Sequence, residues 1–299
     1  MRIVVTGSSG LLGKTFVPSL TQQGHRVTKL VRRKPVADAG EAFWDPQAGE
    51  LDAAVFNNVD AVLHLAGESI AEGRWTAKRK MHIRESRIRS TELVVKTLCK
   101  LPRPPKILVS ASAIGYYGNR GEQVLTEKSP AGDGFLADVC RDWEDATSPA
   151  TANGIRVVNL RFGLILTPEG GALAKLLLPF KLGVGGKVGS GRQYWSWIAI
   201  DDVTGAMQHA LVSEEVSGPV NITAPTPVTN IEFTRALGSA LSRPAILPAP
   251  AFALRLALGE MADELLLASA RVQPEKLLST GYRFRFTDLD AALRHLLPR

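Results

Sequence analysis

The first thirteen residues constrain the fold of this chain more than any other stretch. Residues 2–6 are a short apolar run rich in β-branched side chains, a glycine-rich turn follows at once, and a helical pattern of apolar residues begins after it. This order predicts a strand, a tight turn and a helix, which is the context that a dinucleotide-binding fingerprint requires. The alternative is an ordinary strand-to-helix turn punctuated by glycine.

Three glycines, Gly7, Gly10 and Gly13, occupy the turn with the spacing G-x-x-G-x-x-G. Gly7 allows the tight turn, Gly10 lets the backbone approach a pyrophosphate, and Gly13 lets the helix pack close to the strand. The free N–H groups at the start of the helix attract phosphate. We therefore predict a phosphate-binding loop formed by Thr6, Gly7, Ser8, Gly10, Leu11, Leu12 and Gly13.

The second predicted strand, residues 25–31, ends in Arg32, Arg33 and Lys34. A site for NAD usually has an acidic residue at about this position, bound to the ribose 2′-hydroxyl. The sequence has none there, and a guanidinium would instead pair with a 2′-phosphate. We therefore prefer NADP(H) and expect Arg32 and Arg33 to bind it. A basic loop that only solvates the strand end is the alternative.

Later apolar runs also end in residues suited to ligand binding. Residues 60–66, DAVLHLA, precede Gly67 and are typical of a strand buried on both faces of a parallel sheet. Residues 107–110 and 157–162 predict two more strands. Ligands bind at the carboxyl ends of parallel strands in such sheets. The further cofactor contacts that we expect are Leu65, Ala66, Gly67, Glu68, Ser110 and Arg161.

Composition limits the class of protein. The 299 residues are 45% hydrophobic and 22% charged, which is typical of a globular chain with a large core. The best candidate for a membrane span, residues 247–270, is interrupted by four charged side chains. The two cysteines predict no disulfide framework and no metal cluster. Without a charged-then-apolar leader, we expect a cytoplasmic protein.

The net charge of +7 permits acidic partners. Most of the basic side chains between residues 74 and 89 lie on a predicted helix, which we interpret as a solvated face. A surface for a phosphorylated ligand or an acidic partner is the alternative. Aromatic residues do not interleave with these charges, so we expect no nucleic-acid binding. The seven basic residues are Arg74, Lys78, Arg79, Lys80, Arg84, Arg87 and Arg89.

The pattern changes after residue 165. A glycine-rich loop at residues 183–191 is too long for a tight turn, and we expect it to be functional or lid-like. A strand at residues 220–222 returns the chain to the sheet, and the remaining chain is mostly helical. Thr287 with Asp290 predicts a capping box for the last helix.

Taken together, these motifs resemble the extended short-chain dehydrogenases/reductases. They are TGxxGxxG at residues 6–13, DAVLHLAG at 60–67, a serine-rich strand end before Tyr117-Gly118, LRFG at 160–163 and WIAIDD at 197–202. More narrowly, GSGRQYWSWIAIDD and the tail from about residue 248 resemble the atypical epimerase-family group often labelled sugar nucleotide epimerase or cell-division-inhibitor-like. That group has its own C-terminal helical domain.

The resemblance implies an α/β fold with a doubly wound, parallel-sheet Rossmann domain. This domain would span residues 1–165, with a return at about 196–224, and a smaller, mostly helical substrate region would comprise 166–195 and 225–299. The implied chemistry is hydride transfer at a carbon that bears a hydroxyl or keto group. In the family a Ser orients that oxygen, a Tyr moves its proton, and a Lys four residues later holds the nicotinamide ribose. The cation also lowers the pKa of the Tyr, which is otherwise about 10.

The Tyr-x-x-x-Lys pair is missing from this chain. Aligned through Glu144, its two positions hold Leu136 and Cys140. Ser112 matches the catalytic serine of the family, and Tyr116 is our preferred proton donor, with Tyr117 as the alternative. Neither tyrosine is followed by a suitable lysine.

Two main hypotheses follow. The first is an NADP-dependent oxidoreductase or epimerase that uses Ser112 and Tyr116 on a small molecule, phosphorylated or nucleotide-linked among the options, with residues 183–191 and Arg192 closing over it. The second is an NADP-binding regulator that has lost catalysis, with a link to cell division suggested by the group's label. A fold that binds no cofactor is a third reading. We expect no membrane partner and leave monomer and homodimer open.

Overall fold

The computed structural model describes residues 1–36 and 38–298 and is built around one large sheet. The strands of this sheet are β1 (Arg2–Thr6), β2 (Arg26–Val31), β3 (Glu41–Asp45), β4 (Glu50–Leu51), β5 (Ala61–His64), β6 (Ile107–Ala113), β8 (Arg156–Phe162) and β12 (Gly218–Ile222). Their order is β12-β8-β6-β5-β1-β2-β3-β4. Every neighbouring pair is parallel except β3 and β4. The predicted parallel sheet is therefore confirmed.

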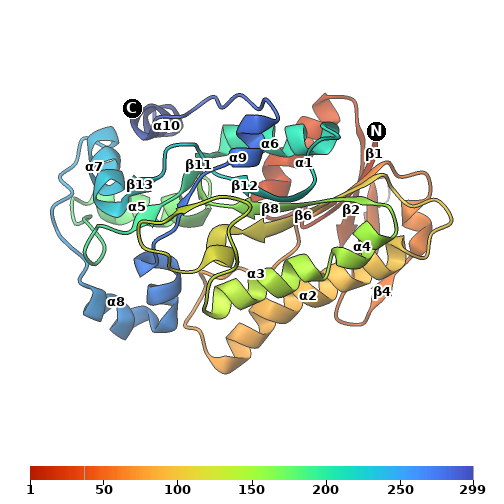
Figure 1. The fold of residues 1–299 in the computed structure, drawn as a ribbon, viewed down its shortest axis with the longest axis horizontal. Helices are drawn as coiled ribbons and strands as arrows, with labels where there is room; N and C mark the ends of the chain where they lie inside the picture. The colour runs from red at the N-terminus through yellow and green to blue at the C-terminus, as the bar shows by residue number, and fades with distance from the viewer. Residues whose placement is uncertain (37, 299) are drawn as a thin grey trace.

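Helices cover both faces of the sheet (Figure 1). One face carries α1 (Leu11–Gln22), α6 (Ile200–Val212) and α9 (Glu275–Ser279), and the other carries α2 (Ala77–Leu98), α3 (Phe135–Asp145) and α4 (Ser148–Ala152). Val4 and Val5 are both fully buried, but they belong to the apolar clusters of opposite faces. Because side chains alternate along a strand, a continuous apolar run is what a doubly covered strand requires.

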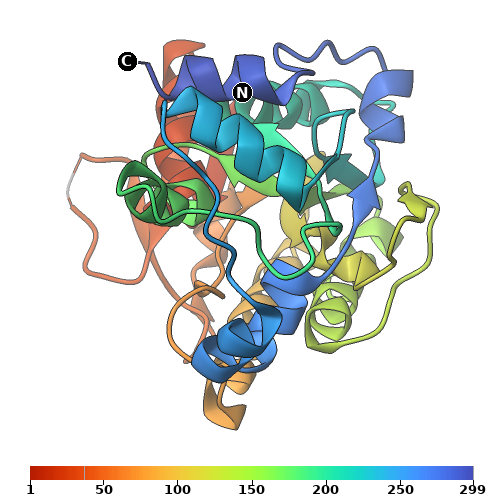
Figure 2. The same cartoon turned by 90° about the vertical axis from the view of Figure 1, so that its left-hand side faces the viewer.

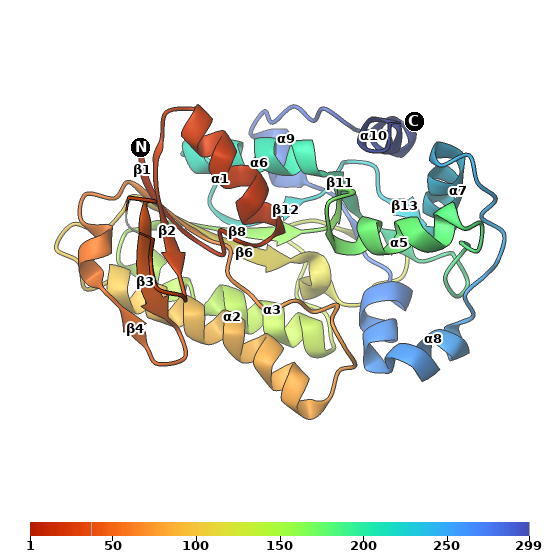
Figure 3. The ribbon, with the colours of Figure 1, turned by 180° about the vertical axis from the view of Figure 1, so that it is seen from behind.

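The remaining helices gather at one end of the molecule (Figures 2 and 3). They are α5 (Gly171–Lys181), α7 (Asn230–Ala240), α8 (Ala251–Leu258), the π-helix Ala262–Leu267 and α10 (Leu289–Leu296). Trp197, Phe233 and Leu293 anchor a separate apolar cluster there. The mostly helical C-terminal part is thus confirmed, whereas the predicted domain boundaries stay a prediction.

Short elements complete the structure. The strands are β7 (Val124–Leu125), β9 (Leu164–Leu166), β10 (Tyr194–Trp195), β11 (Trp197–Ala199), β13 (Val228–Thr229) and β14 (Arg271–Val272). The 3₁₀ turns are Ala53–Phe56 and Ile114–Tyr117. The segment at residues 194–199 forms two short strands, β10 and β11, on either side of Ser196.

One local expectation needs correction, and a second stays a prediction. The side chain of Asp288 caps α10 by accepting a hydrogen bond from the Ala291 amide, so Thr287 is not the cap. The glycine-rich loop 183–191 is bound to a neighbouring segment, because the Gly189 amide donates to Ala249 and the Ala249 amide donates to Lys187. These backbone bonds attach the loop to Ala249 in this structure, and its functional or lid-like role stays a prediction.

Candidate functional site

The glycines of the predicted phosphate loop are required by close backbone contacts. Gly7 has a φ of +68°, and a Cβ placed on it would lie 2.6 Å from the carbonyl carbon of Leu65. A Cβ on Gly13 would lie 2.5 Å from the Cα of Ser8. Gly10 is the N-cap residue of α1, and no side chain caps this end of the helix. The amides of the first helical turn therefore remain available for an anion.

A buried chain of hydrogen bonds supports this loop. The Thr6 hydroxyl accepts hydrogen bonds from the amides of Leu65 and Ala66, at 3.1 and 3.2 Å. It also lies 2.8 Å from Nδ1 of His64, whose Nε2 lies 3.2 Å from the Ser90 hydroxyl on α2. Burial lowers the pKa of His64 to about 4, so the ring is neutral at pH 7. Sequence reasoning missed His64, although a histidine within an apolar run was a signal.

The two arginines after β2 have different surroundings. Both terminal nitrogens of Arg33 donate hydrogen bonds to the Glu41 carboxylate, at 2.9 and 2.8 Å. These bonds, together with one from the Val36 amide, lower the pKa of Glu41 to about 2. Arg32 is exposed and has no hydrogen bond or ion pair to any other described residue. Of the two, Arg32 is the guanidinium that remains available at the end of β2.

Ser112 and Arg161 belong to one buried network. The Ser112 hydroxyl donates to Glu144 at 2.6 Å, and Arg161 donates to both carboxylate oxygens of Glu144 at 2.8 and 2.7 Å. Arg161 also donates to the Tyr117 hydroxyl at 2.9 Å, and that hydroxyl donates to Asn221 at 2.7 Å. The Arg161 side chain is only 3% exposed. The structure thus directs its nitrogens to protein groups, and its predicted contact with a cofactor stays a prediction.

Of the two neighbouring tyrosines, Tyr116 has the available phenol. Tyr117 is fully buried, and desolvation raises its pKa to about 12. Tyr116 is half-buried, and the guanidinium of Arg161 lies 3.5 Å from its ring centroid. The Tyr116 hydroxyl makes no hydrogen bond within the described part of the chain.

The helix α3 presents apolar groups where the sequence lacks the Tyr-Lys pair. A Cβ on Gly115 would lie 3.2 Å from the Leu136 Cβ and 3.8 Å from the Cys140 sulfur, so both side chains face the turn that contains Tyr116. Burial raises the pKa of the Cys140 thiol to about 12. Neither residue supplies a proton or a positive charge at pH 7.

The other predicted cofactor contacts are residues that follow β5 and one residue of β6. The Glu68 carboxylate pairs with Arg79 at 3.1 Å. Gly67 packs against Arg87, since an added Cβ would lie 3.4 Å from the guanidinium carbon. Ser110 is fully buried in β6, in register with His64 of β5.

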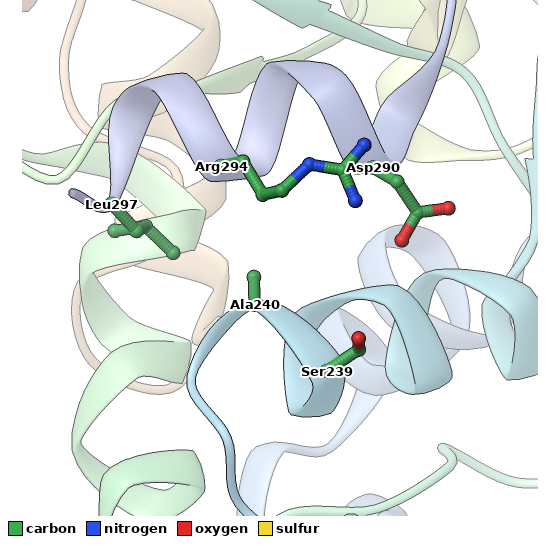
Figure 4. Close-up of a pocket in the computed structure, with 5 residues that line it drawn as sticks. All are labelled: Ser239, Ala240, Asp290, Arg294 and Leu297. Carbon is green, nitrogen blue, oxygen red and sulfur yellow. The ribbon is translucent and has the colours of Figure 1, made fainter. Parts of the chain in front are cut away.

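Two surface hollows lie away from the glycine loop. One, of about 280 Å³, lies between α7 and α10 and is lined by Ser239, Ala240, Asp290, Arg294 and Leu297 (Figure 4). The other, of about 450 Å³, includes Glu144 and Asn159 but no residue of the phosphate loop. Within the residues that the structure describes, no cluster of side chains could hold a metal ion, and no helix is long and apolar enough to span a membrane.

Comparison with known families and structures fits this arrangement. A family model described as the NAD dependent epimerase/dehydratase family matches residues 3–223. The chain belongs to this family. A second model, described as a domain of unknown function (DUF1731), matches residues 249–296. The resemblance seen in the sequence is therefore confirmed.

Relatives within the epimerase/dehydratase family match along the whole chain. An epimerase family protein of Mycobacterium bovis is 43% identical over 99% of this chain and 98% of its own. The crystal structure of the human epimerase family protein SDR39U1 with NADPH has a TM-score of 0.89 and 34% identity, and the match covers 99% of each chain. A nucleoside-diphosphate sugar epimerase of Corynebacterium glutamicum has a TM-score of 0.82 and 37% identity, over 99% of this chain and 58% of that one.

The WIAIDD motif of this epimerase-family chain has a structural use that the sequence did not reveal. Asp202 is buried and accepts hydrogen bonds from the amides of Arg285 and Phe286, at 2.7 and 2.9 Å. The Tyr282 hydroxyl lies 3.1 Å from the same carboxylate. The motif therefore fastens the segment before α10 to the helix α6.

Proposed function

We propose that this chain binds NADP(H) at the carboxyl edge of its sheet and acts as an oxidoreductase or epimerase on a hydroxyl or keto substrate. The observation that carries the proposal is the uncapped start of α1 behind Gly7 and Gly10, with the unpaired Arg32 at the end of the adjacent strand β2. The N–H groups suit a pyrophosphate and the guanidinium suits a 2′-phosphate. The human relative crystallised with NADPH supports the same cofactor.

The bound cofactor would supply a carbon that gives or accepts a hydride. The chain's own groups would orient and protonate the substrate. Ser112 donates its single hydroxyl hydrogen to Glu144, so its oxygen acts toward a substrate as an acceptor. We therefore assign Ser112 the role of orienting a substrate hydroxyl. Tyr116, with its unbonded phenol, is the group that we expect to move the proton.

The substrate class that we favour is nucleotide-linked. The relative named as a nucleoside-diphosphate sugar epimerase aligns with 99% of this chain at 37% identity. Arg192, an exposed cation just after the glycine-rich loop, is available for an anionic group of such a ligand.

A second candidate is a protein that binds NADP(H) without turnover. It is favoured by Leu136 and Cys140, which place an apolar side chain and an uncharged thiol where the family chemistry needs a phenol and a cation. Steady consumption of NADPH or NADP⁺ with a panel of nucleotide sugars and ketones would favour the first candidate. Tight binding without turnover across that panel would favour the second.

Binding is tested by titrating the protein with NADPH and NADH. We expect NADPH to bind about tenfold or more tightly, because a charge-assisted contact to the 2′-phosphate is worth about 1.5–3 kcal/mol. Arg32→Gln should remove this preference, and Lys34→Gln, on an exposed neighbour, should keep it. Equal affinities of the wild type for both nucleotides would refute the role of Arg32. Absence of binding to either would refute the proposed function.

A further inference from the structure

Arg87 on α2 is a cation held without a carboxylate partner. Its Nη1 donates to the Ile83 carbonyl and its Nη2 to the Glu68 carbonyl, each at 2.9 Å. The guanidinium carbon lies 5.0 Å from the centroid of a Trp143 ring. Burial lowers the pKa of Arg87, but a guanidinium stays charged at pH 7. A half-buried charge is stabilised by hydrogen bonds to oxygen atoms, so further oxygen ligands would stabilise Arg87.

Most other cations of this helix differ from Arg87 in having a carboxylate partner. Four of them form ion pairs with carboxylates, so most of the basic stretch seen in the sequence is a paired surface. The pairs are Arg79 with Glu68, Lys80 with Glu260, Arg84 with Asp142, and Arg89 with Glu85. Arg87 has no ion pair within the described residues. Lys78 and Lys96 also have none, but both are exposed, whereas Arg87 is half-buried. A guanidinium has five N–H donors and two of these are used, so three remain.

Arg87 lies between the loop after β5 and the helix α3. Its guanidinium carbon would be 3.4 Å from a Cβ on Gly67. The charge of Arg87 also affects the pKa of Cys140. Burial raises the pKa of that thiol, and the positive charge of Arg87 opposes the rise. Figure 1 shows α2 and α3 running together beneath the sheet, and the two helices are in contact. The cation therefore lies beside the position on α3 where the sequence lacks a lysine.

The strand order indicates which half of a dinucleotide would reach Arg87. The phosphate loop follows β1, which lies between β2 and β5 in the sheet. Arg32 follows β2, on one side of the loop, and Gly67 follows β5, on the other. A dinucleotide crosses the sheet edge with its pyrophosphate at this point. If its 2′-phosphate lies at Arg32, its nicotinamide half extends toward β5, β6 and Arg87.

We propose that Arg87 is a cofactor-binding residue that donates hydrogen bonds to the nicotinamide ribose hydroxyls. It supplies from α2 the positive charge that Cys140 does not supply from α3. This inference rests on the proposed function, because it requires NADP(H) to be the ligand.

The test compares two ligands by calorimetric titration. NADPH contains both halves of the cofactor, whereas adenosine 2′,5′-bisphosphate contains the 2′-phosphate but lacks the nicotinamide ribose. We expect Arg87→Gln to weaken NADPH binding about tenfold or more and to leave the bisphosphate within about twofold. Arg87→Lys, which keeps the charge, should recover part of the loss. Arg89→Gln, a change to an exposed ion pair on the same helix, should alter neither affinity.

The outcomes separate the inference from the proposed function. Unchanged NADPH affinity in Arg87→Gln would overturn the inference and leave the proposed function intact. Equal weakening of both ligands would also overturn it, since Arg87 would then only hold the loop that contains Gly67. A wild-type chain that binds neither ligand would overturn the proposed function itself. If Arg87→Gln fails to fold, the same two-ligand comparison on Arg87→Lys decides, and a loss limited to NADPH is expected.

Discussion

His64 links the stability of the phosphate loop to pH. Its ring is fully buried between Thr6 and Ser90, at 2.8 and 3.2 Å, and burial lowers its pKa from 6.5 to about 4. Between these two values the unfolded chain binds a proton that the native protein does not. The free energy of unfolding therefore rises with pH up to about 6.5. The contribution is complete above that value and is lost as the pH falls toward 4.

The size of the effect follows from the two pKa values. Each unit of difference between the folded and unfolded pKa corresponds to about 1.36 kcal/mol. Lowering the pH from 7 to 5 covers about 1.5 units of the window in which only the unfolded state is protonated. The protein should therefore lose about 2 kcal/mol through His64 alone. At pH 5 the native ring remains mostly neutral, so the loss does not require a change in the folded structure.

Urea unfolding at pH 7 and pH 5 measures this loss directly. The matched variant is His64→Gln, whose amide can still bond to Thr6 and does not titrate. We expect the wild type to lose about 2 kcal/mol more than the variant between the two pH values. His25 and His209 also have lowered pKa values, but they are present in both proteins and cancel. Equal losses in the two proteins would refute the reasoning.

Three further changes have expected outcomes. Gly13→Ala should destabilise the protein by about 1–3 kcal/mol and abolish NADPH binding in a titration, because the added Cβ meets the backbone of the phosphate loop. Glu144→Gln should lower the free energy of urea unfolding by about 3–5 kcal/mol, since it leaves the buried Arg161 without a counterion. Asp202→Asn should speed hydrogen exchange at residues 282–297, because one of its bonds to Arg285 and Phe286 must be lost.

The substitutions Glu144→Gln and Asp202→Asn each have a matched control. Asp142→Asn disrupts the more exposed pair with Arg84 and should cost about 1 kcal/mol or less. Asp201→Asn alters the neighbouring carboxylate, which pairs with the side chain of Arg285 at 2.8 Å, and should leave exchange nearly unchanged. Equal effects of Glu144→Gln and Asp142→Asn would contradict the assignment of a buried network. Unchanged exchange in Asp202→Asn would contradict its anchoring role.

The local features of the fold were predictable from sequence. The run of β-branched residues before Gly7 and the apolar spacing after Gly13 determine a strand and a helix through interactions within a few residues. The apolar run at residues 60–66 likewise predicted β5, because a strand buried on both faces has a nearly continuous apolar pattern, which only His64 interrupts within β5. The basic end of β2 identified Arg32 before its lack of partners was known.

The partners of charged groups were not predictable, because they lie on other elements of the fold. Arg161 is committed to Glu144, seventeen residues away on another element. Arg33 was grouped with Arg32, but Glu41 on β3 binds it. Arg87 was one basic residue among seven, and its bonds to two backbone carbonyls and its contact with Gly67 distinguish it only in the structure. Sequence spacing defines the faces of a helix, but it does not say which carboxylate meets each face.

The central claim is that the glycine loop and Arg32 bind NADP(H), and a crystal structure of the chain with NADPH tests it most directly. The account predicts that the pyrophosphate accepts hydrogen bonds from the amides of Leu11 and Leu12, and that the 2′-phosphate lies within hydrogen-bonding distance of Arg32. A cofactor bound away from the start of α1, or a 2′-phosphate held by other groups while Arg32 stays unpaired, would contradict it.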